Sequence, residues 1–370
     1  MKVIISGGGT GGHIFPAISI ANALREIDPS TEILFVGAKG KMEMERVPAE
    51  GYTIKGLPVA GFHRQLNLKN VVRNIAFPFK LIASMYQARK IVKDFKPDVA
   101  VGVGGYASGP VLRCASNAGV PCLLQEQNSF PGVTNRILSQ KAQKICVAYP
   151  NMERFFEPSK IILTGNPVRQ QLLQNTNKAE GYEFFGVDSN KPVVLVIGGS
   201  LGARSINNGI KETLDDLGTD CQLIWQTGKI YYDDIKAELD AKPRENVKAM
   251  AFIQRMDLAF AIADIVISRA GASSISELSL LGKASILVPS PNVSEDHQTK
   301  NARALSDKGA AILVKDAECN TLLKEAKKAL LSADKIAELK NNIVEFARPN
   351  ASKDIANEVI ALANQKRLTK

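Results

Sequence analysis

The chain has 370 residues, of which 45% are hydrophobic, and this is enough for two domains with ordinary buried cores. Its five cysteines show no C-x-x-C spacing, so a disulfide-bonded secreted scaffold is not expected and a reducing cytoplasm is. No apolar run approaches the roughly 18 residues that span a bilayer, and the N-terminus enters a strand pattern directly, so neither a membrane-spanning helix nor a signal segment is expected.

The net charge of +10 is concentrated in the first half of the chain. Residues 1–164 contain 20 Lys and Arg against 11 Asp and Glu, whereas residues 165–370 contain 27 against 26. Within the basic half, residues 51–93 have eight basic side chains, no acid and many large apolar residues. This pattern is typical of a segment on an anionic membrane surface, of a core helix with a solvated basic face, and of a nucleic-acid-binding patch. The residues alone leave these three interpretations open.

The first strand pattern, residues 2–6, runs into Gly7-Gly-Gly-Thr-Gly-Gly-His13, and a helical pattern follows from Pro16. Glycine lets backbone N–H groups crowd around a ligand, and the start of a helix favours anions. The spacing also fits the dinucleotide fingerprint, but the next strand, residues 32–36, ends without the acid that would hold a ribose. No Lys-Ser or Lys-Thr pair follows Gly12, as a P-loop requires. We therefore interpret the turn as part of a phosphate- or sugar-handling enzyme, with a structural turn as the alternative.

Strand and helix patterns alternate along the rest of the chain. This alternation predicts an α/β protein with two doubly wound, Rossmann-like parallel-sheet domains, residues 1–164 and 165–348, facing a cleft, and a last helix in residues 349–370 that packs back on the first domain. The predicted strands lie near residues 2–6, 32–36, 98–103, 121–125, 144–148 and 161–164, then near 193–197, 222–226, 247–251, 264–268, 284–288 and 311–314. Ligands of such sheets bind beyond the carboxyl ends of the strands, so the turns that follow the strands are the candidate sites.

Several of these turns carry the residue types of a binding site. Glycine-rich turns occur again at Gly104-Gly105-Tyr106 and at Gly198-Gly199-Ser200. Another strand ends in the polar cluster Gln125-Glu-Gln-Asn128. After the strand near 264–268, a small-residue turn leads into a helix predicted to start at Ser273 or Ser274. Ser274 and Glu277 have the spacing of a capping box; the functional alternative is that the helix start binds a nucleotide diphosphate and Glu277 accepts hydrogen bonds from a ribose.

Taken together, these motifs resemble the MurG family of bacterial glycosyltransferases. The resemblance runs in order over nearly the whole chain: it rests on Gly7–His13 with Phe15-Pro-Ala17, Gly104–Pro110, Glu126-Gln-Asn128, Gly165-Asn-Pro-Val-Arg169, Gly198–Arg204, and Arg269 through Glu277. It implies the two-domain GT-B fold and inverting transfer of N-acetylglucosamine from UDP-N-acetylglucosamine to an undecaprenyl-linked muramyl-pentapeptide. Where family members commonly have a histidine before Glu126, this chain has Gln125, so no catalytic role can rest on that position.

The resemblance also implies roles for particular residues. His13 is the first candidate for the catalytic base, because a helix N-terminus disfavours the protonated imidazole, and Glu126 is the second. The residues that it implies for UDP-N-acetylglucosamine are Thr10, Gly11, Gly12, Asn128, Arg169, Ser200, Ile253, Ala272, Ser273, Ser274, Ile275, Ser276, Glu277 and Gln298. Those for the acceptor are Gly104, Gly105, Tyr106 and Asn135.

No cofactor or metal is expected, because no Asp-x-Asp pair stands near these turns and fixed dipoles can stabilise a leaving diphosphate. Ile75, Phe77, Phe79 and Ile82 are expected to contact an anionic inner-membrane surface at its cytoplasmic face, with Pro78 breaking any helix between the two phenylalanines. Nucleic acid is not expected as a partner. The alternative functions are another sugar-nucleotide enzyme of this fold, with a different lipid acceptor or with UDP-N-acetylglucosamine epimerase activity, and a basic binding protein without enzymatic activity.

Overall fold

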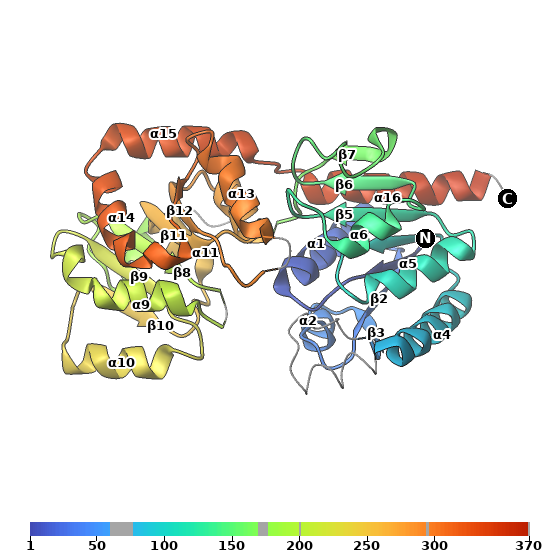
Figure 1. Ribbon diagram of the computed structural model, residues 1–370, viewed down its shortest axis with the longest axis horizontal. Coiled ribbons are helices and arrows are strands. Elements are labelled where there is room, and N and C mark those ends of the chain that lie inside the picture. Colours follow the sequence, from blue (N-terminus) through green and yellow to red (C-terminus); the bar gives the residue numbers. More distant parts are fainter. Residues whose placement is uncertain (60–76, 169–176, 200, 294–295, 369–370) are drawn as a thin grey trace. The chain divides into compact units, whose positions relative to one another are not determined.

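The computed structural model describes residues 1–59, 77–168, 177–199, 201–293 and 296–368. The chain divides into two compact units (Figure 1): one comprises Met1–Val168 with Arg348–Lys370, and the other comprises Arg169–Ala347. Residues 165–168 belong to the first unit, where Asn166 is bonded to the end of a central strand. Both units are α/β and parallel-sheeted, which confirms the predicted fold class.

The first unit contains a seven-stranded parallel sheet in the order β3-β2-β1-β4-β5-β6-β7. The reversal of strand order beside β1 is the switch point at which ligands bind in open parallel sheets. The strands are β1 Lys2–Ser6, β2 Glu32–Ala38, β3 Thr53–Leu57, β4 Val99–Gly102, β5 Cys122–Glu126, β6 Lys144–Val147 and β7 Ile161–Leu163. The edge strand β3 was not predicted, because Lys55 and Gly56 interrupt its apolar pattern.

The second unit repeats the plan with a six-stranded parallel sheet in the order β10-β9-β8-β11-β12-β13. Its strand order reverses beside β8, so the same rule places its ligand site near the carboxyl ends of β8 and β11. The strands are β8 Val193–Ile197, β9 Gln222–Gln226, β10 Val247–Met250, β11 Ile265–Arg269, β12 Ser285–Val288 and β13 Ile312–Leu313. The central strands β8 and β11 are almost wholly buried, as expected when helices cover both faces of a parallel sheet.

Helices cover both faces of the first sheet (Figure 1). One apolar core lies under α4, α5 and α6, and a separate core lies under α1 and α16, where the last helix of the chain packs against the first. The helices among the described residues of this unit are α1 Gly11–Ile27, α2 Glu43–Ala49, α4 Phe77–Phe95, α5 Ser108–Asn117, α6 Val133–Leu138, the short 3-10 helix η1 Pro158–Lys160, and α16 Ala351–Leu368.

The second unit has its own core between the sheet and the surrounding helices, with Trp225 fully buried and its ring N–H bonded to Asn207 (3.0 Å). Its helices are α8 Lys178–Phe185, α9 Arg204–Glu212, η2 Leu214–Leu217, α10 Tyr232–Ala241, α11 Met256–Ile262, α12 Ala272–Leu280, α13 His297–Ser306, η4 Asp316–Thr321, α14 Leu322–Leu330, α15 Ala333–Ile343 and η5 Val344–Phe346. Among the described residues, no helix is long and apolar enough to cross a membrane.

Two local predictions were wrong. The helix α12 begins at Ala272, with Gly271 in the capping position and no side-chain cap, so Ser274 and Glu277 do not form a capping box. The small residues at 270–272 let the chain turn into the helix before Ser273. Pro78 does not break a helix; it is the second residue of α4, in the first turn, where a helix tolerates proline because the missing N–H needs no partner there.

Candidate active site

The glycine turn after β1 is packed around a buried carboxylate that was not predicted. Glu43, at the start of α2, is 1% exposed, and it accepts hydrogen bonds from the backbone N–H groups of Gly9 (3.1 Å) and Ala38 (3.0 Å). A Cβ atom at Gly8 would lie 2.2 Å from Oε1 of Glu43, and one at Gly37 would lie 2.5 Å from its Cγ. Glycine at 8 and 37 therefore makes room for the carboxylate that holds the turn.

His13 is the third residue of α1 and lies beside the second glycine turn. Its Nδ1 is 3.1 Å from the hydroxyl of Thr10, the N-cap residue. Gly104 has a φ of +90°, and a Cβ atom there would lie 3.0 Å from both Cδ2 and Nε2 of the His13 ring. The structure thus brings Thr10, Gly11, Gly12 and His13 together with Gly104, and the lack of a side chain at 104 leaves room beside Nε2.

The two glycine turns of the first unit are in direct backbone contact. Gly105 has a φ of +83°, and a Cβ atom there would lie 2.4 Å from the carbonyl oxygen of Gly8. No other residue fits this approach, because both the positive φ and the contact exclude a side chain. Tyr106, which follows, is 54% exposed, so its ring is accessible to a ligand.

Glu126 is the last residue of β5, and its carboxylate is enclosed by hydrogen-bond donors. Oε1 accepts from the backbone N–H (3.0 Å) and the side-chain amide (3.2 Å) of Asn128, and Oε2 accepts from the N–H of Gly132 (3.2 Å) and the amide of Asn135 (2.9 Å). Burial raises the pKa of this carboxyl, and these hydrogen bonds lower it in part. The carboxylate shapes the loop between β5 and α6 and holds two other predicted site residues, Asn128 in that loop and Asn135 on α6.

Asn135 is oriented by this network. It is 2% exposed, and its amide nitrogen also donates to the carbonyl oxygen of Gln125 (3.2 Å). The Asn135 amide nitrogen lies 3.7 Å from the position of a Cβ atom at Gly104, so this side chain and the His13 ring flank the same glycine. Its Oδ1 is buried, and no group in the described part of the chain donates to it.

The residue at the atypical position 125 is part of a buried amide network. Gln125 is fully buried; its Nε2 donates to Oδ1 of Asn166 (3.0 Å), and its Oε1 accepts from the amide of Gln127. The Asn166 amide in turn donates to the carbonyl oxygen of Gln127 (3.0 Å). These contacts connect the end of β5 to the segment that follows β7.

In the second unit, the candidate residues lie at the carboxyl ends of neighbouring strands. Gln226, which was not predicted, ends β9; its amide donates to the carbonyl oxygen of Gly199 (3.1 Å), and its Oε1 accepts from the N–H of Ile253 (3.0 Å). It therefore ties the glycine turn after β8 to the loop that contains Ile253. Gly202 has a φ of +87°, and a Cβ atom there would lie 2.2 Å from the carbonyl oxygen of Thr227.

The helix α12 presents its first turn beside that glycine turn, because β11 pairs with β8. Ala272, Ser273 and Ser274 are its first three residues, and their backbone N–H groups have no acceptor within the helix. The Ser273 hydroxyl is buried, and no described group bonds to it, whereas Ser276 bonds to the carbonyl oxygen of Ala272 (3.0 Å). Ile275 is buried in the core, and Glu277 follows on the same helix.

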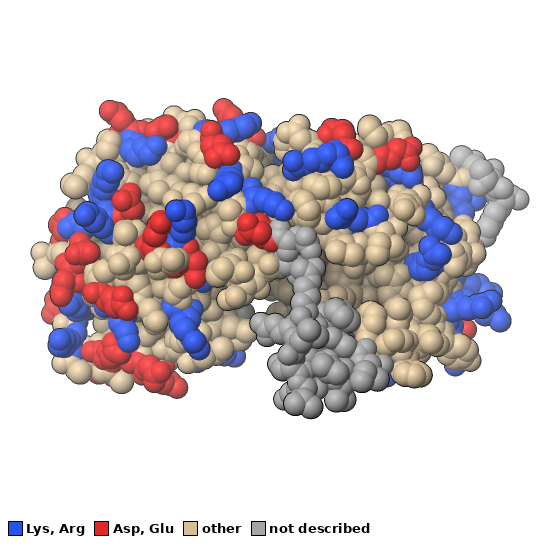
Figure 2. All heavy atoms as spheres, viewed as in Figure 1, with Lys and Arg blue, Asp and Glu red and all other residues tan. Residues whose placement is uncertain are grey.

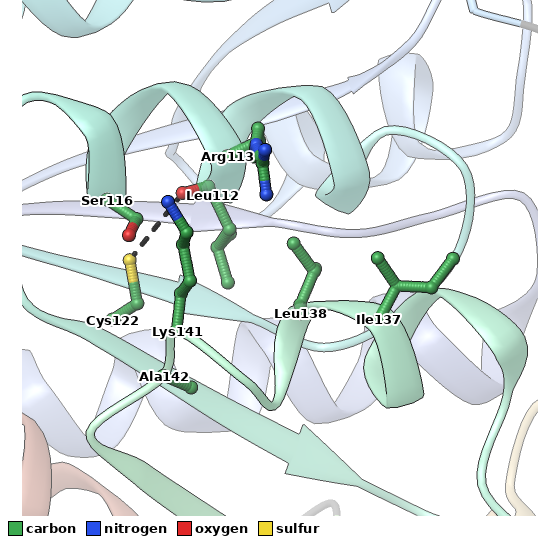
Figure 3. A pocket seen from close by; sticks show the side chains of 8 residues that line it. All are labelled: Leu112, Arg113, Ser116, Cys122, Ile137, Leu138, Lys141 and Ala142. Atoms are coloured by element: carbon green, nitrogen blue, oxygen red, sulfur yellow. Dashed lines mark hydrogen bonds between the residues drawn. The ribbon is translucent and has the colours of Figure 1, made fainter.

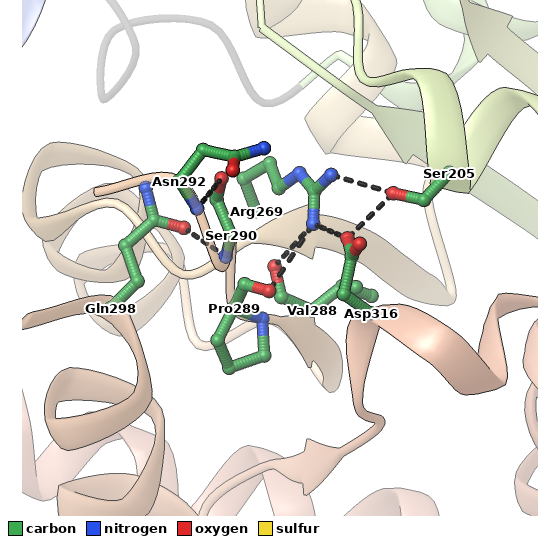
Figure 4. Close-up of polar contacts among 8 residues, drawn as sticks. All are labelled: Ser205, Arg269, Val288, Pro289, Ser290, Asn292, Gln298 and Asp316. Carbon is green, nitrogen blue, oxygen red and sulfur yellow. Dashed lines mark hydrogen bonds and ion pairs between the residues drawn. The ribbon is translucent and has the colours of Figure 1, made fainter. Parts of the chain in front are cut away.

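Arg269 links the loops around this site (Figure 4). Its guanidinium donates to the carbonyl oxygens of Val288 and Pro289 (both 3.3 Å) and to the hydroxyl of Ser205 (2.7 Å), and it pairs with Asp316. The Ser205 hydroxyl also donates to Asp316 (2.6 Å). One cation therefore joins the start of α9, the ends of β11 and β12, and η4.

Gln298, at the start of α13, is the last of the described candidate residues in the second unit. Its Oε1 accepts from the backbone N–H of Ser290 (2.9 Å), so it fixes the loop after β12 (Figure 4). The predicted residues Arg169, Ser200 and Ile75 lie outside the described residues. No cluster of His, Cys, Asp and Glu among the described residues could hold a metal ion.

The described membrane-facing candidates, Phe77, Phe79 and Ile82, lie on α4. Phe79 is 72% exposed and Ile82 is 67% exposed, whereas Phe77 is half-buried. Tyr86, one turn further on and 76% exposed, was not singled out. Its exposure follows from the helical spacing of three and four residues between positions 79, 82 and 86.

Comparisons with known proteins cover both units. The model of the glycosyltransferase family 28 N-terminal domain matches residues 3–147, and that of the C-terminal domain matches residues 193–359. The chain is 55% identical over 370 residues to the UDP-N-acetylglucosamine--N-acetylmuramyl-(pentapeptide) pyrophosphoryl-undecaprenol N-acetylglucosamine transferase of Bacteroides fragilis. The aligned region covers 99% of this chain and 96% of that protein.

Solved structures agree with this result. The crystal structure of Acinetobacter baumannii MurG superposes with a TM-score of 0.77 at 28% identity and covers 97% of this chain and 99% of that one. The UDP-GlcNAc 2-epimerase of Neisseria meningitidis, bound to UDP-GlcNAc, has a TM-score of 0.67 at 16% identity and covers 98% of this chain and 100% of that one. The second match shows a shared fold alone.

The enclosed carboxylate of Glu126 generates a prediction for stability. In Glu126→Gln, an NH2 group replaces one oxygen and faces two donors, so the free energy of unfolding falls by about 1–3 kcal/mol. Burial raises the pKa of the Glu126 carboxyl. The free energy of unfolding of the wild-type protein therefore falls as the pH rises from the ordinary pKa of a carboxyl group through this raised pKa. The variant lacks this decrease. Urea denaturation as a function of pH measures both effects. The exposed Glu153→Gln is the control, and equal stability of both variants would contradict the role of Glu126.

Proposed function

The chain belongs to glycosyltransferase family 28, and we infer that it transfers N-acetylglucosamine from UDP-N-acetylglucosamine to undecaprenyl-pyrophosphoryl-N-acetylmuramyl-pentapeptide, a step of peptidoglycan synthesis. The observation that carries this conclusion is the 55% identity over 99% of the chain to a relative whose name states that reaction. The epimerase alternative has only a shared fold at 16% identity in its favour.

We propose that His13 is the general base. With the Thr10 hydroxyl accepting from Nδ1–H, the ring presents its Nε2 lone pair beside Gly104, where a side chain would block it. The acceptor hydroxyl gives its proton to Nε2 as it attacks the anomeric carbon, and UDP leaves from the opposite face, so the configuration inverts. A neutral imidazole takes up a proton readily near pH 7.

Glu126 acts in this proposal as a positioning residue. Each of its oxygens already accepts two hydrogen bonds, so it has little capacity left to take a proton from a substrate. It holds Asn128, assigned here to the donor, and Asn135, whose buried Oδ1 accepts a hydrogen bond from the acceptor. Gly104, Gly105 and Tyr106 contribute the rest of the acceptor site.

Most of the donor-binding residues lie in loops of the second unit in this proposal. The first-turn N–H groups of α12, from Ala272 to Ser274, together with Ser200 and Arg169, receive the diphosphate. The orphaned hydroxyl of Ser273 is the kind of buried group that a ligand satisfies. Glu277 accepts from the ribose hydroxyls, and Ile253, Ile275, Ser276 and Gln298 line the remainder. Helix dipoles and side chains stabilise the leaving UDP without an essential metal.

We place the protein on the cytoplasmic face of the membrane as a peripheral enzyme. Phe79, Ile82 and Tyr86 form one exposed stripe of α4, and Lys90 and Lys93 continue that helix. Apolar side chains enter the headgroup boundary while basic ones meet anionic lipid. The acceptor keeps its undecaprenyl chain in the bilayer, so the enzyme must come to it.

The assignment of the base is tested by His13→Ala. We expect kcat to fall about 10²- to 10⁴-fold, the usual contribution of a general base, while UDP affinity measured by calorimetry is unchanged. In the same assay, Glu126→Gln should lower kcat less than His13→Ala does. Adding Glu126→Gln to His13→Ala should restore none of the lost kcat. If His13→Ala keeps activity within a few-fold and Glu126→Gln abolishes it, Glu126 is the base.

Glu277→Gln tests the donor site. Because Glu277 is not part of a helix cap, the substitution leaves the start of α12 intact. We expect UDP-N-acetylglucosamine to bind about 1–3 kcal/mol more weakly, since a charged acceptor is lost, with the same melting temperature. The control is Glu318→Gln, on η4 of the same unit. Equal donor affinity for the wild type and both variants would remove Glu277 from the site.

Membrane docking is tested by co-sedimentation with vesicles. The wild-type protein should bind anionic vesicles in a salt-dependent manner, because each basic residue near the surface contributes about 1 kcal/mol. The double variant Phe79→Ser, Ile82→Ser should bind more weakly, whereas Ile230→Ser, Leu331→Ser, which alters exposed apolar residues of the second unit, should not. Equal binding to neutral and anionic vesicles would contradict the proposal.

A further inference from the structure

Gln125 is a buried polar residue to which the proposed mechanism assigns no role. Charged side chains are spread over the face of the protein seen in Figure 2, whereas Gln125, Gln127 and Asn166 are uncharged and no more than 3% exposed. Nε2 of Gln125 donates to Oδ1 of Asn166 (3.0 Å), and its Oε1 accepts from Nε2 of Gln127. A buried amide is costly unless both of its ends have partners. The side chain at 125 therefore has to be a donor and an acceptor at once.

Two backbone carbonyl groups fix the direction of every hydrogen bond in this network. The carbonyl oxygen of Val103 accepts from Nε2 of Gln127 (2.8 Å), so this end of the Gln127 amide also faces Oε1 of Gln125. Nε2 of Gln125 then points to Asn166, whose Oδ1 accepts from it. The Asn166 amide nitrogen donates to the carbonyl oxygen of Gln127 (3.0 Å). Turning over any one of the three amides would place two donors or two acceptors face to face.

The network joins three segments of the first unit that carry or adjoin candidate site residues. Val103 directly precedes Gly104, the glycine that flanks the proposed base. The glutamine that donates to Val103 directly precedes Asn128, in the loop after β5. Asn166 follows β7 and lies just before the end of the first unit. Gln125 is the central member, because its amide is bonded to both of the other amides.

We propose that Gln125 is a positioning residue for the transfer of N-acetylglucosamine, because its amide fixes the Gly104 turn relative to the loop that carries Asn128. This inference rests on the proposed function. Gln125 is fully buried, so it acts through its partners and not on a substrate. Through Gln127 it holds the carbonyl group of Val103, and with it the space beside the proposed base. One donor and one acceptor meet this requirement, whereas a group with donors only or acceptors only breaks the network.

Two variants that titrate in opposite directions test this role. In Gln125→Glu, the ionised carboxylate has no donor for Asn166, whereas the protonated acid has one donor and one acceptor, as the amide does. In Gln125→His, the neutral ring has one donor and one acceptor, whereas the protonated ring has two donors and faces the amide nitrogen of Gln127. As the pH falls from about 8 to about 5, the ratio of variant kcat to wild-type kcat should rise about tenfold for Gln125→Glu and fall about tenfold for Gln125→His.

The ratio to the wild type isolates the group introduced at position 125. Cys146, which pairs with Gln125 on β6, stays neutral in this pH range, because burial raises the pKa of its thiol to about 12. The other titratable groups near the network are common to the wild type and the variants, so their effects cancel in the ratio. They are His13, Glu126, Lys144, Arg348, Asp354 and Glu358.

The other end of β5 provides the matched control. Cys122, the first residue of this strand, lies beside Leu112 of α5, whose carbonyl oxygen is 3.7 Å from its thiol (Figure 3). The backbone N–H of Cys122 donates to Oε1 of Gln143 (2.7 Å), which is not part of the network. In Gln143→Glu this acceptor is kept, so the ratio of kcat to the wild-type value should not depend on pH.

Asn166→Asp tests the other end of the network. Its carboxylate accepts from Gln125 but has no donor for the carbonyl oxygen of Gln127, and protonation restores that donor, so it should behave as Gln125→Glu does. It carries the test if the melting temperature shows that the variants at 125 are unfolded. Ratios that do not change with pH in the folded variants would overturn the proposal. A wild type that transfers no sugar would overturn the proposed function instead.

Discussion

The architecture of the first unit depends on the buried carboxylate of Glu126. A carboxylate out of water is costly unless donors surround it, and here three N–H groups from the loop between β5 and α6 and one from Asn135 on α6 provide that environment. The same bonds fix the shape of the loop and the direction in which Asn135 presents its oxygen. Glu43 has the same relation to the glycine turn after β1, so each of the two loops is folded around its own buried carboxyl group.

The second unit uses the opposite charge for the same purpose. The guanidinium of Arg269 donates to two backbone carbonyls and a hydroxyl, and its charge is balanced by Asp316. In the first unit, buried carboxyl groups accept hydrogen bonds from backbone N–H groups, and in the second a guanidinium donates to backbone carbonyls. Removing one member of such a network leaves a buried charge without its partner, which costs more than the net contribution of the pair. Both arrangements keep loops at the ends of parallel strands rigid.

The sequence allowed the fold class and most of the strands to be predicted, because long apolar runs and glycine turns are local signals. The edge strand β3 was not predicted, since Lys55 and Gly56 interrupt its apolar pattern. Glu43 and Gln226 were not predicted for another reason. Their hydrogen-bond partners lie up to 34 and 27 residues away along the chain, and local sequence spacing does not indicate such contacts. The start of α12 was misplaced because Ser274 and Glu277 have the spacing of a cap, whereas Gly271 sets the actual turn.

The place of α16 has a consequence for how the protein is made. Ile355 and Val359 of this helix belong to the apolar core that also contains residues of α1 and β1, yet they follow the whole second unit in the chain. On the ribosome, the first unit emerges with one face of its sheet partly uncovered, and the whole second unit is synthesised before that face can be closed. The first unit therefore folds to completion only after the second unit and α16 have been synthesised. A prematurely terminated chain exposes apolar surface that chaperones and proteases recognise.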